Sequence, residues 1–207
     1  MLFSVDADAR PYAEETIKKS RFIARLRRVD SEAAFTAFLA DVREIERGAG
    51  HHCYAYVIGE DEGSRIERFS DDGEPGGTAG APMLAALHGR SLVNVAAVVS
   101  RYYGGVNLGA GGLVRAYSGT VIAALEATAL RPRVRAQLFR LAVEHATAGW
   151  VEAELRRRGF EVVEVAYAER AAITVATAEP SGLQAAVAEI TSGATDLVHV
   201  GHVWRER

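Results

Sequence analysis

The sequence has little cysteine and no long apolar run. Its 207 residues include one cysteine, Cys53, which excludes an internal disulfide and any zinc site built from several cysteines. No stretch approaches the roughly 20 consecutive apolar residues of a membrane-spanning helix. Asp6 and Asp8 stand where a signal peptide would be basic. We therefore expect a cytoplasmic protein that does not interact with membranes.

An excess of positive charge is also missing. The formal net charge is −3, with 24 Lys and Arg against 27 Asp and Glu. This balance gives no global attraction to nucleic acid, so such binding would need a local basic patch. Only two basic residues are lysines, Lys18 and Lys19. A chain of this length is long enough to form one large domain or two small ones, each with a buried core.

The first half of the chain predicts a mixture of strands and helices. Residues 20–29 alternate as a strand, with Phe22, Ala24 and Leu26 on one face and arginines on the other. Asp30 or Ser31 is expected to cap the helix that follows. The other expected elements are strands at residues 51–59, 64–70 and 93–103, the last buried on both faces, and helices from Pro82 onward and over residues 113–125.

The pattern changes around Arg131-Pro132-Arg133, which divides the chain into predicted domains of residues 1–131 and 135–207. Ser181 and Gln184 have the spacing of a capping box at the start of a helix. The second domain predicts the order strand, helix, strand, strand, helix, strand, which is the βαββαβ order of ferredoxin-like domains. Its segments are residues 137–144, 147–158, 161–167, 171–178, 181–191 and 196–204. The predicted fold class is α+β.

Two glycine-rich stretches stand out in the first domain. Nine of the 20 glycines lie within residues 73–80 or 104–112. We call residues 70–77, SDDGEPGG, the acidic loop, and residues 103–112, YGGVNLGAGG, the glycine loop. The question is what two such loops hold between them.

The glycine loop has the features of an anion site. Glycines before a helix leave the first backbone N–H groups free. Arg101 and Arg115 flank the loop and offer bidentate contacts to phosphate, while Tyr102 and Tyr103 can stack on a base or cap a partner's apolar side chain. Alternatively, the glycines only allow positive φ angles and close packing. We expect Arg101 to contact a ligand and Arg115 to brace the loops by pairing with an acid.

The acidic loop presents three carboxylates, those of Asp71, Asp72 and Glu74. Oxygen ligands of this kind suit Mg²⁺, but the same carboxylates can simply accept backbone hydrogen bonds within the turn. We assign no metal site and no cofactor. The loop is expected to fix the shape and charge of a recognition surface that it shares with the glycine loop.

The stretch HHCY suggests a nucleophile or a metal site. On a strand, His51 and Cys53 share one face while His52 and Tyr54 share the other, so one His–Cys pair is the most that can form. No spacing typical of a catalytic triad accompanies it, although triads are defined in space and stay open. We expect Cys53 to be buried and inert, and we assign no catalytic residue.

Four blocks resemble the signature blocks of the IMPACT family, in order and spacing, over residues 16 to about 130. They are KKSRFIA, HHCYAYVIG, FSDDGEPGGTAGAPML and VVSRYYGGVNLGAGGLVRAY. The tail resembles the small, elongation-factor-G-like carboxy-terminal domain of the bacterial, YigZ-type members. The resemblance implies a ribosomal protein S5 domain 2-like first domain and a ferredoxin-like second one. Eukaryotic relatives are translation regulators, whereas bacterial members have no settled activity.

The resemblance implies a non-enzymatic, translation-linked regulatory or binding protein that contacts rRNA, tRNA or a ribosome-associated protein through the two loops. One alternative is an enzyme acting on a phosphorylated or peptide substrate at the acid–glycine–arginine surface. Another is a purely protein-binding regulator. The oligomeric state is left open. The candidate binding residues are Arg21, Asp71, Asp72, Glu74, Arg101, Tyr102, Tyr103, Gly109, Gly111, Gly112 and Arg115.

Overall fold

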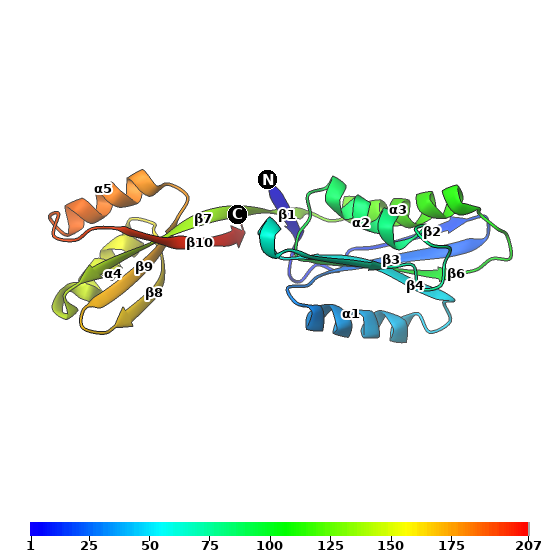
Figure 1. Ribbon diagram of the computed structural model, residues 1–207, viewed down its shortest axis with the longest axis horizontal. Helices are drawn as coiled ribbons and strands as arrows, with labels where there is room; N and C mark the ends of the chain where they lie inside the picture. Colours follow the sequence, from blue (N-terminus) through cyan, green and yellow to red (C-terminus); the bar gives the residue numbers. More distant parts are fainter. Residues whose placement is uncertain (207) are drawn as a thin grey trace. The chain divides into compact units, whose positions relative to one another are not determined.

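The computed structural model describes residues 1–206 and is shown in Figure 1. Within these residues it is an α+β protein with two antiparallel sheets and five α-helices. The chain forms two compact units, Met1–Arg133 and Val134–Arg207. No helix of the described chain is long and apolar enough to cross a bilayer.

The first unit is built on a sheet with the strand order β2-β3-β6-β4-β5. Helices α2 and α3 cover one face of this sheet and α1 covers the other, as Figure 1 shows. The elements in chain order are β1 (Leu2–Val5), β2 (Tyr12–Ile17), β3 (Ser20–Arg28), α1 (Glu32–Ile45), β4 (His51–Ile58), a 3-10 turn (Glu62–Ser64), β5 (Ile66–Ser70), α2 (Gly80–Gly89), β6 (Val95–Tyr102), α3 (Ala110–Glu126) and the start of β7 (Leu130–Val143).

Alternation along β3 and β6 produces the two cores. Phe22, Ala24 and Leu26 of β3 pack against α2 and α3, which confirms the face predicted from the sequence. Strand β6 is central, and its residues 95–100 are buried on both faces, again as expected. Ser31 is the N-cap of α1, where its hydroxyl accepts a hydrogen bond from the N–H of Ala34 at 3.2 Å.

Two amino-terminal strands, β1 and β2, were not predicted. Strand β1 pairs with Leu130 and with Arg131-Pro132-Arg133, which form the start of β7. Strand β2 is the edge neighbour of β3, and a tight turn at Lys18 and Lys19 joins the two strands.

The second unit shows the expected order of strand, helix, strand, strand, helix, strand. Its sheet has the order β10-β7-β9-β8, and both helices pack into one apolar core on it. The predicted capping box at Ser181 is wrong, since Glu179 is the N-cap and makes no side-chain cap bond. The elements after β7 are α4 (His145–Arg157), β8 (Glu161–Tyr167), β9 (Ala171–Thr177), α5 (Pro180–Ile190) and β10 (Val198–Glu206).

Candidate functional site

The first acid of the acidic loop organises the start of α2. The carboxylate of Asp71 accepts hydrogen bonds from the N–H groups of Gly77, Ala79 and Gly80 at 2.8, 2.9 and 2.8 Å. Partial burial alone would raise the pKa of Asp71, but these backbone donors together hold it below its ordinary value. Asp71 therefore folds the loop back onto the helix that follows.

The second acid ties the loop to β4. Asp72 has a positive φ of 44°; its carboxylate accepts from the N–H of His52 at 2.6 Å, and its carbonyl lies 2.7 Å from Nδ1 of His51. Both aspartates thus follow the structural alternative, in which carboxylates accept backbone hydrogen bonds. In the part of the chain that the structure describes, no group of three His, Cys, Asp or Glu side chains could hold a metal ion.

The third acid forms a buried ion pair with the end of β6. Nη1 of Arg101 lies 2.7 and 2.9 Å from the two carboxylate oxygens of Glu74, which also accepts from the hydroxyl of Tyr117 at 2.6 Å. Glu74 is 8% exposed and Arg101 is 6% exposed. Burial raises the pKa of Tyr117, so the phenol stays protonated and donates. This cluster links the acidic loop to β6 and α3.

The structure corrects the roles expected of the two arginines. Arg101, expected to contact a ligand, is the residue that braces the acidic loop. Arg115, expected to do so, forms no hydrogen bond or ion pair within residues 1–206. Instead it lines a hollow of about 220 Å³ with Lys18, Leu108 and Gly112. Arg115 therefore carries an uncompensated charge beside the glycine loop.

Several positions of the glycine loop require glycine for reasons of backbone geometry. A Cβ on Gly104 would lie 2.1 Å from the carbonyl carbon of Lys19, while Gly109 has a φ of 74° and is the N-cap of α3 without a side-chain bond. Gly111 and Gly112 have no such positive φ. A Cβ on Gly111 would meet only Arg115, at 3.6 Å, whereas a Cβ on Gly112 would lie 3.0 Å from Cβ of Leu108. The strongest backbone demand therefore lies before α3, at Gly104 and Gly109, and Gly112 adds a tight contact inside the first turn.

A second hollow, of about 310 Å³, lies between the two loops. Its lining includes Glu74 and Arg101 on one side and Gly109 and the start of α3 on the other. Tyr103 is 57% exposed there, and its hydroxyl donates to Asn107 at 3.0 Å. This hollow brings together the acidic loop, the glycine loop and the N-terminus of α3, as the sequence suggested.

Arg21 and Tyr102 lie elsewhere. Because neighbouring side chains of a strand point to opposite faces, Tyr102 faces away from Arg101. Its hydroxyl donates to Glu46 of the α1 side at 2.9 Å, and the Arg21 guanidinium lies 5.0 Å from its ring centroid. Arg21 also pairs with Glu14 at 2.8 Å. These two candidates are brought together, but not with the loops.

Cys53 has the environment of a structural thiol. It is fully buried, and Sγ donates to the carbonyl of Asp71 at 3.0 Å. Burial raises the pKa of this thiol to about 12. The residue lies behind the acidic loop and supports it from inside.

Native Cys53 is expected to resist alkylation at neutral pH. Only a very small fraction of the thiol is ionised there, and the side chain is closed to reagent, so iodoacetamide should label native protein at least about 100-fold more slowly than protein in denaturant. Mass spectrometry of timed samples measures both rates. Rapid labelling of the native protein would show that the thiol is open and reactive.

Comparison with known proteins gives the family. Residues 18–125 match the Impact N-terminal domain, and residues 141–194 match a domain of unknown function, DUF1949. The chain belongs to the IMPACT family. The predicted resemblance, including its YigZ-type branch, is confirmed.

The similarity of this IMPACT family member extends over most of its length. It is 38% identical to IMPACT family member YvyE of Bacillus subtilis over 89% of this chain and 85% of that protein. It is 39% identical to IMPACT family member YigZ of Escherichia coli over 90% of this chain and 92% of that protein. A solved structure described as that of a hypothetical protein covers 97% of this chain and 98% of its own, with a TM-score of 0.75 and 37% identity.

Proposed function

We propose that this IMPACT family member is a non-enzymatic, translation-linked regulatory protein of the cytoplasm that binds RNA through the basic side of its glycine loop. Family membership supports the link to translation, because eukaryotic members are translation regulators. We further propose that the first unit is S5 domain 2-like and the second ferredoxin-like. The strand order β10-β7-β9-β8, with both helices in one core, supports the second assignment.

The observation that carries RNA binding is a strained basic turn beside a free arginine. Lys18 and Lys19, with φ angles of 45° and 67°, form the two-residue turn between β2 and β3. Asn-Gly is the preferred sequence for such turns, and a lysine in this conformation costs about 1 kcal/mol or more. Lys18 lines the same hollow as Arg115. Two cations held next to a helix N-terminus suit the phosphates of an RNA backbone.

The enzyme alternative rested on the acids, glycines and arginines of the two loops, and several of these side chains have structural roles. Asp71, Asp72, Glu74 and Arg101 are engaged in holding the acidic loop. Cys53 is a buried thiol with a raised pKa. These groups build the loop on which a binding surface rests, which favours recognition over turnover.

Replacing the lysine turn separates binding from stability. Lys18→Asn combined with Lys19→Gly should raise the free energy of unfolding by about 1 kcal/mol, because both residues suit the turn. The same change should weaken binding of a fluorescein-labelled 20-nucleotide RNA hairpin. Affinity falls as salt rises, and each lost phosphate contact should make the slope of log affinity against log salt shallower by about 0.7–0.9. Fluorescence anisotropy across a salt series and thermal unfolding measure the two effects.

Arg115→Ala should also make the slope of log affinity against log salt shallower, and it should leave the melting temperature nearly unchanged. Arg68→Ala, an exposed arginine on β5, is the matched control and should change neither quantity. Failure of the unaltered protein to bind the hairpin at low salt would refute RNA binding. Equal slopes for the unaltered and Arg115→Ala proteins would remove the glycine loop from the contact.

A further inference from the structure

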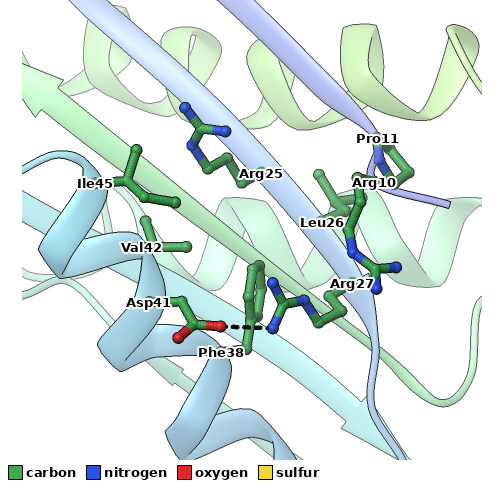
Figure 2. A pocket seen from close by; sticks show the side chains of 9 residues that line it. All are labelled: Arg10, Pro11, Arg25, Leu26, Arg27, Phe38, Asp41, Val42 and Ile45. Atoms are coloured by element: carbon green, nitrogen blue, oxygen red, sulfur yellow. Dashed lines mark hydrogen bonds and ion pairs between the residues drawn. The ribbon is translucent and has the colours of Figure 1, made fainter. Parts of the chain in front are cut away.

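A second basic surface lies on the α1 side of the first unit's sheet. It is a groove of about 280 Å³ between α1, β3 and the segment before β2. Figure 2 shows its three arginines, Arg10, Arg25 and Arg27, and the apolar side chains of α1 that line it with them. We call it the arginine groove. Its α1 lining includes Phe38, Val42 and Ile45.

Separation from the glycine loop follows from the strand. Arg25 and Arg27 alternate with Leu26, whose side chain belongs to the core under α2 and α3. Successive side chains on a strand point to opposite faces. The arginine groove therefore lies on the opposite face of the sheet from α3 and its N-terminal loop, and it is a site of its own.

Positive charge in the groove is only partly compensated. Arg27 pairs with Asp41, the one acid in the lining, at 2.8 Å, and Arg25 pairs with Glu46 at 2.7 Å. Arg10 has no acidic partner within residues 1–206, and its Nη1 donates to two backbone carbonyls, at 2.9 and 2.8 Å. Nε of Arg27 is buried without a hydrogen-bond partner. An anionic group seated here would gain charge-assisted hydrogen bonds.

The exposed apolar surface of the groove is aliphatic rather than aromatic. Ile45 is 59% exposed, whereas Phe38 is 2% exposed. The guanidinium of Arg27 covers the Phe38 ring at 4.7 Å, and that of Arg25 covers the neighbouring Tyr12 ring at 4.9 Å. Since single-stranded nucleic acid relies on open aromatic faces for stacking, this surface favours an aliphatic side chain over a base.

We propose that the arginine groove binds an acidic peptide segment of a partner protein. An aliphatic side chain of the segment packs on Ile45, and flanking carboxylates pair with Arg10 and with the guanidinium groups of Arg25 and Arg27 that face the groove. The peptide needs one apolar side chain between acidic residues. Such a segment complements both the positive charge of the groove and its exposed apolar surface. This inference goes beyond the proposed function and does not depend on RNA binding.

The test uses the full chain and a fluorescein-labelled 12-residue peptide of alternating Glu and Leu, followed by anisotropy at 100 mM salt. Saturable binding is expected, and Arg10→Glu should weaken it about tenfold or more. Ile45→Ser should weaken it about fivefold, because the apolar contact is lost. Both positions are exposed, so folding is expected to persist. Arg68→Glu makes the same charge change on β5 and should alter affinity less than about twofold.

Three further results would overturn the proposal. A Glu–Ser peptide that binds as tightly as the Glu–Leu peptide would show attraction by charge alone. A single-stranded oligonucleotide that binds the groove more tightly, with the same sensitivity to Arg10→Glu, would assign the groove to nucleic acid. Equal losses from Arg10→Glu and Arg68→Glu would show that the effect is global.

Discussion

Arg101→Ala is expected to lower the free energy of unfolding of the first unit by about 3–5 kcal/mol, because it leaves Glu74 buried without a cation. Glu74 is 8% exposed, and the other hydrogen bond to its carboxylate, from Tyr117, does not neutralise it. Thermal unfolding followed by circular dichroism should show a melting temperature lower by about 10 °C or more. We expect the acidic loop to open first, since this pair holds it to β6.

Removing both charges should be less harmful than removing one. In Arg101→Met combined with Glu74→Gln no buried charge is left unpaired, and the side-chain amide oxygen introduced by the second change still accepts the Tyr117 hydrogen bond, so most of the stability should return. Strictly additive losses in the double variant would contradict the ion pair as the bracing contact. The control is Arg90→Ala, which breaks an exposed pair with Glu126, at 3.1 Å, and should cost less than about 1 kcal/mol.

Local patterns in the sequence predict much of this fold because their causes are local. The alternation in β3, the cap at Ser31 and the buried run of β6 all follow from neighbours within a few residues. The edge strand β2 escaped prediction because Glu15 lies on its partly buried face, where alternation would place an apolar residue. β1 is four residues long, and its partner lies more than 120 residues away in the chain. Such pairing has no local signal.

The site shows the same division. That two glycine-rich loops meet could be predicted, and a shared hollow is found between them. Which arginine braces the acidic loop could not, because the answer depends on the face of β6 that looks toward Glu74. One strand position decides it: Arg101 points to that face and Tyr102 to the other. The strain at Lys18 and Lys19 likewise could not be predicted, because it lies in their positive φ angles and lysine is not a residue typical of such turns.

Gly104→Ala is expected to destabilise the first unit by about 3 kcal/mol or more, the upper range for inserting one carbon into a closed contact. The added Cβ would lie 2.1 Å from both the carbonyl carbon and the oxygen of Lys19, and 2.6 Å from its Cβ. These atoms belong to the two-residue turn between β2 and β3, whose backbone has little room to move. The N–H of Gly104 also donates to Ser20 at 3.2 Å, so displacement would break that bond.

Gly111→Ala is the matched control, since it makes the same chemical change seven positions along the chain. Its Cβ would make an ordinary contact of 3.6 Å with Arg115, and alanine is favoured over glycine in a helix by up to about 1 kcal/mol. This variant should therefore melt at the same temperature as the unaltered protein or higher, while Gly104→Ala melts about 10 °C lower or does not fold. Equal melting temperatures for both variants would show that the glycine loop can yield at Gly104, and that its close approach to the lysine turn does not fix the basic side of the site.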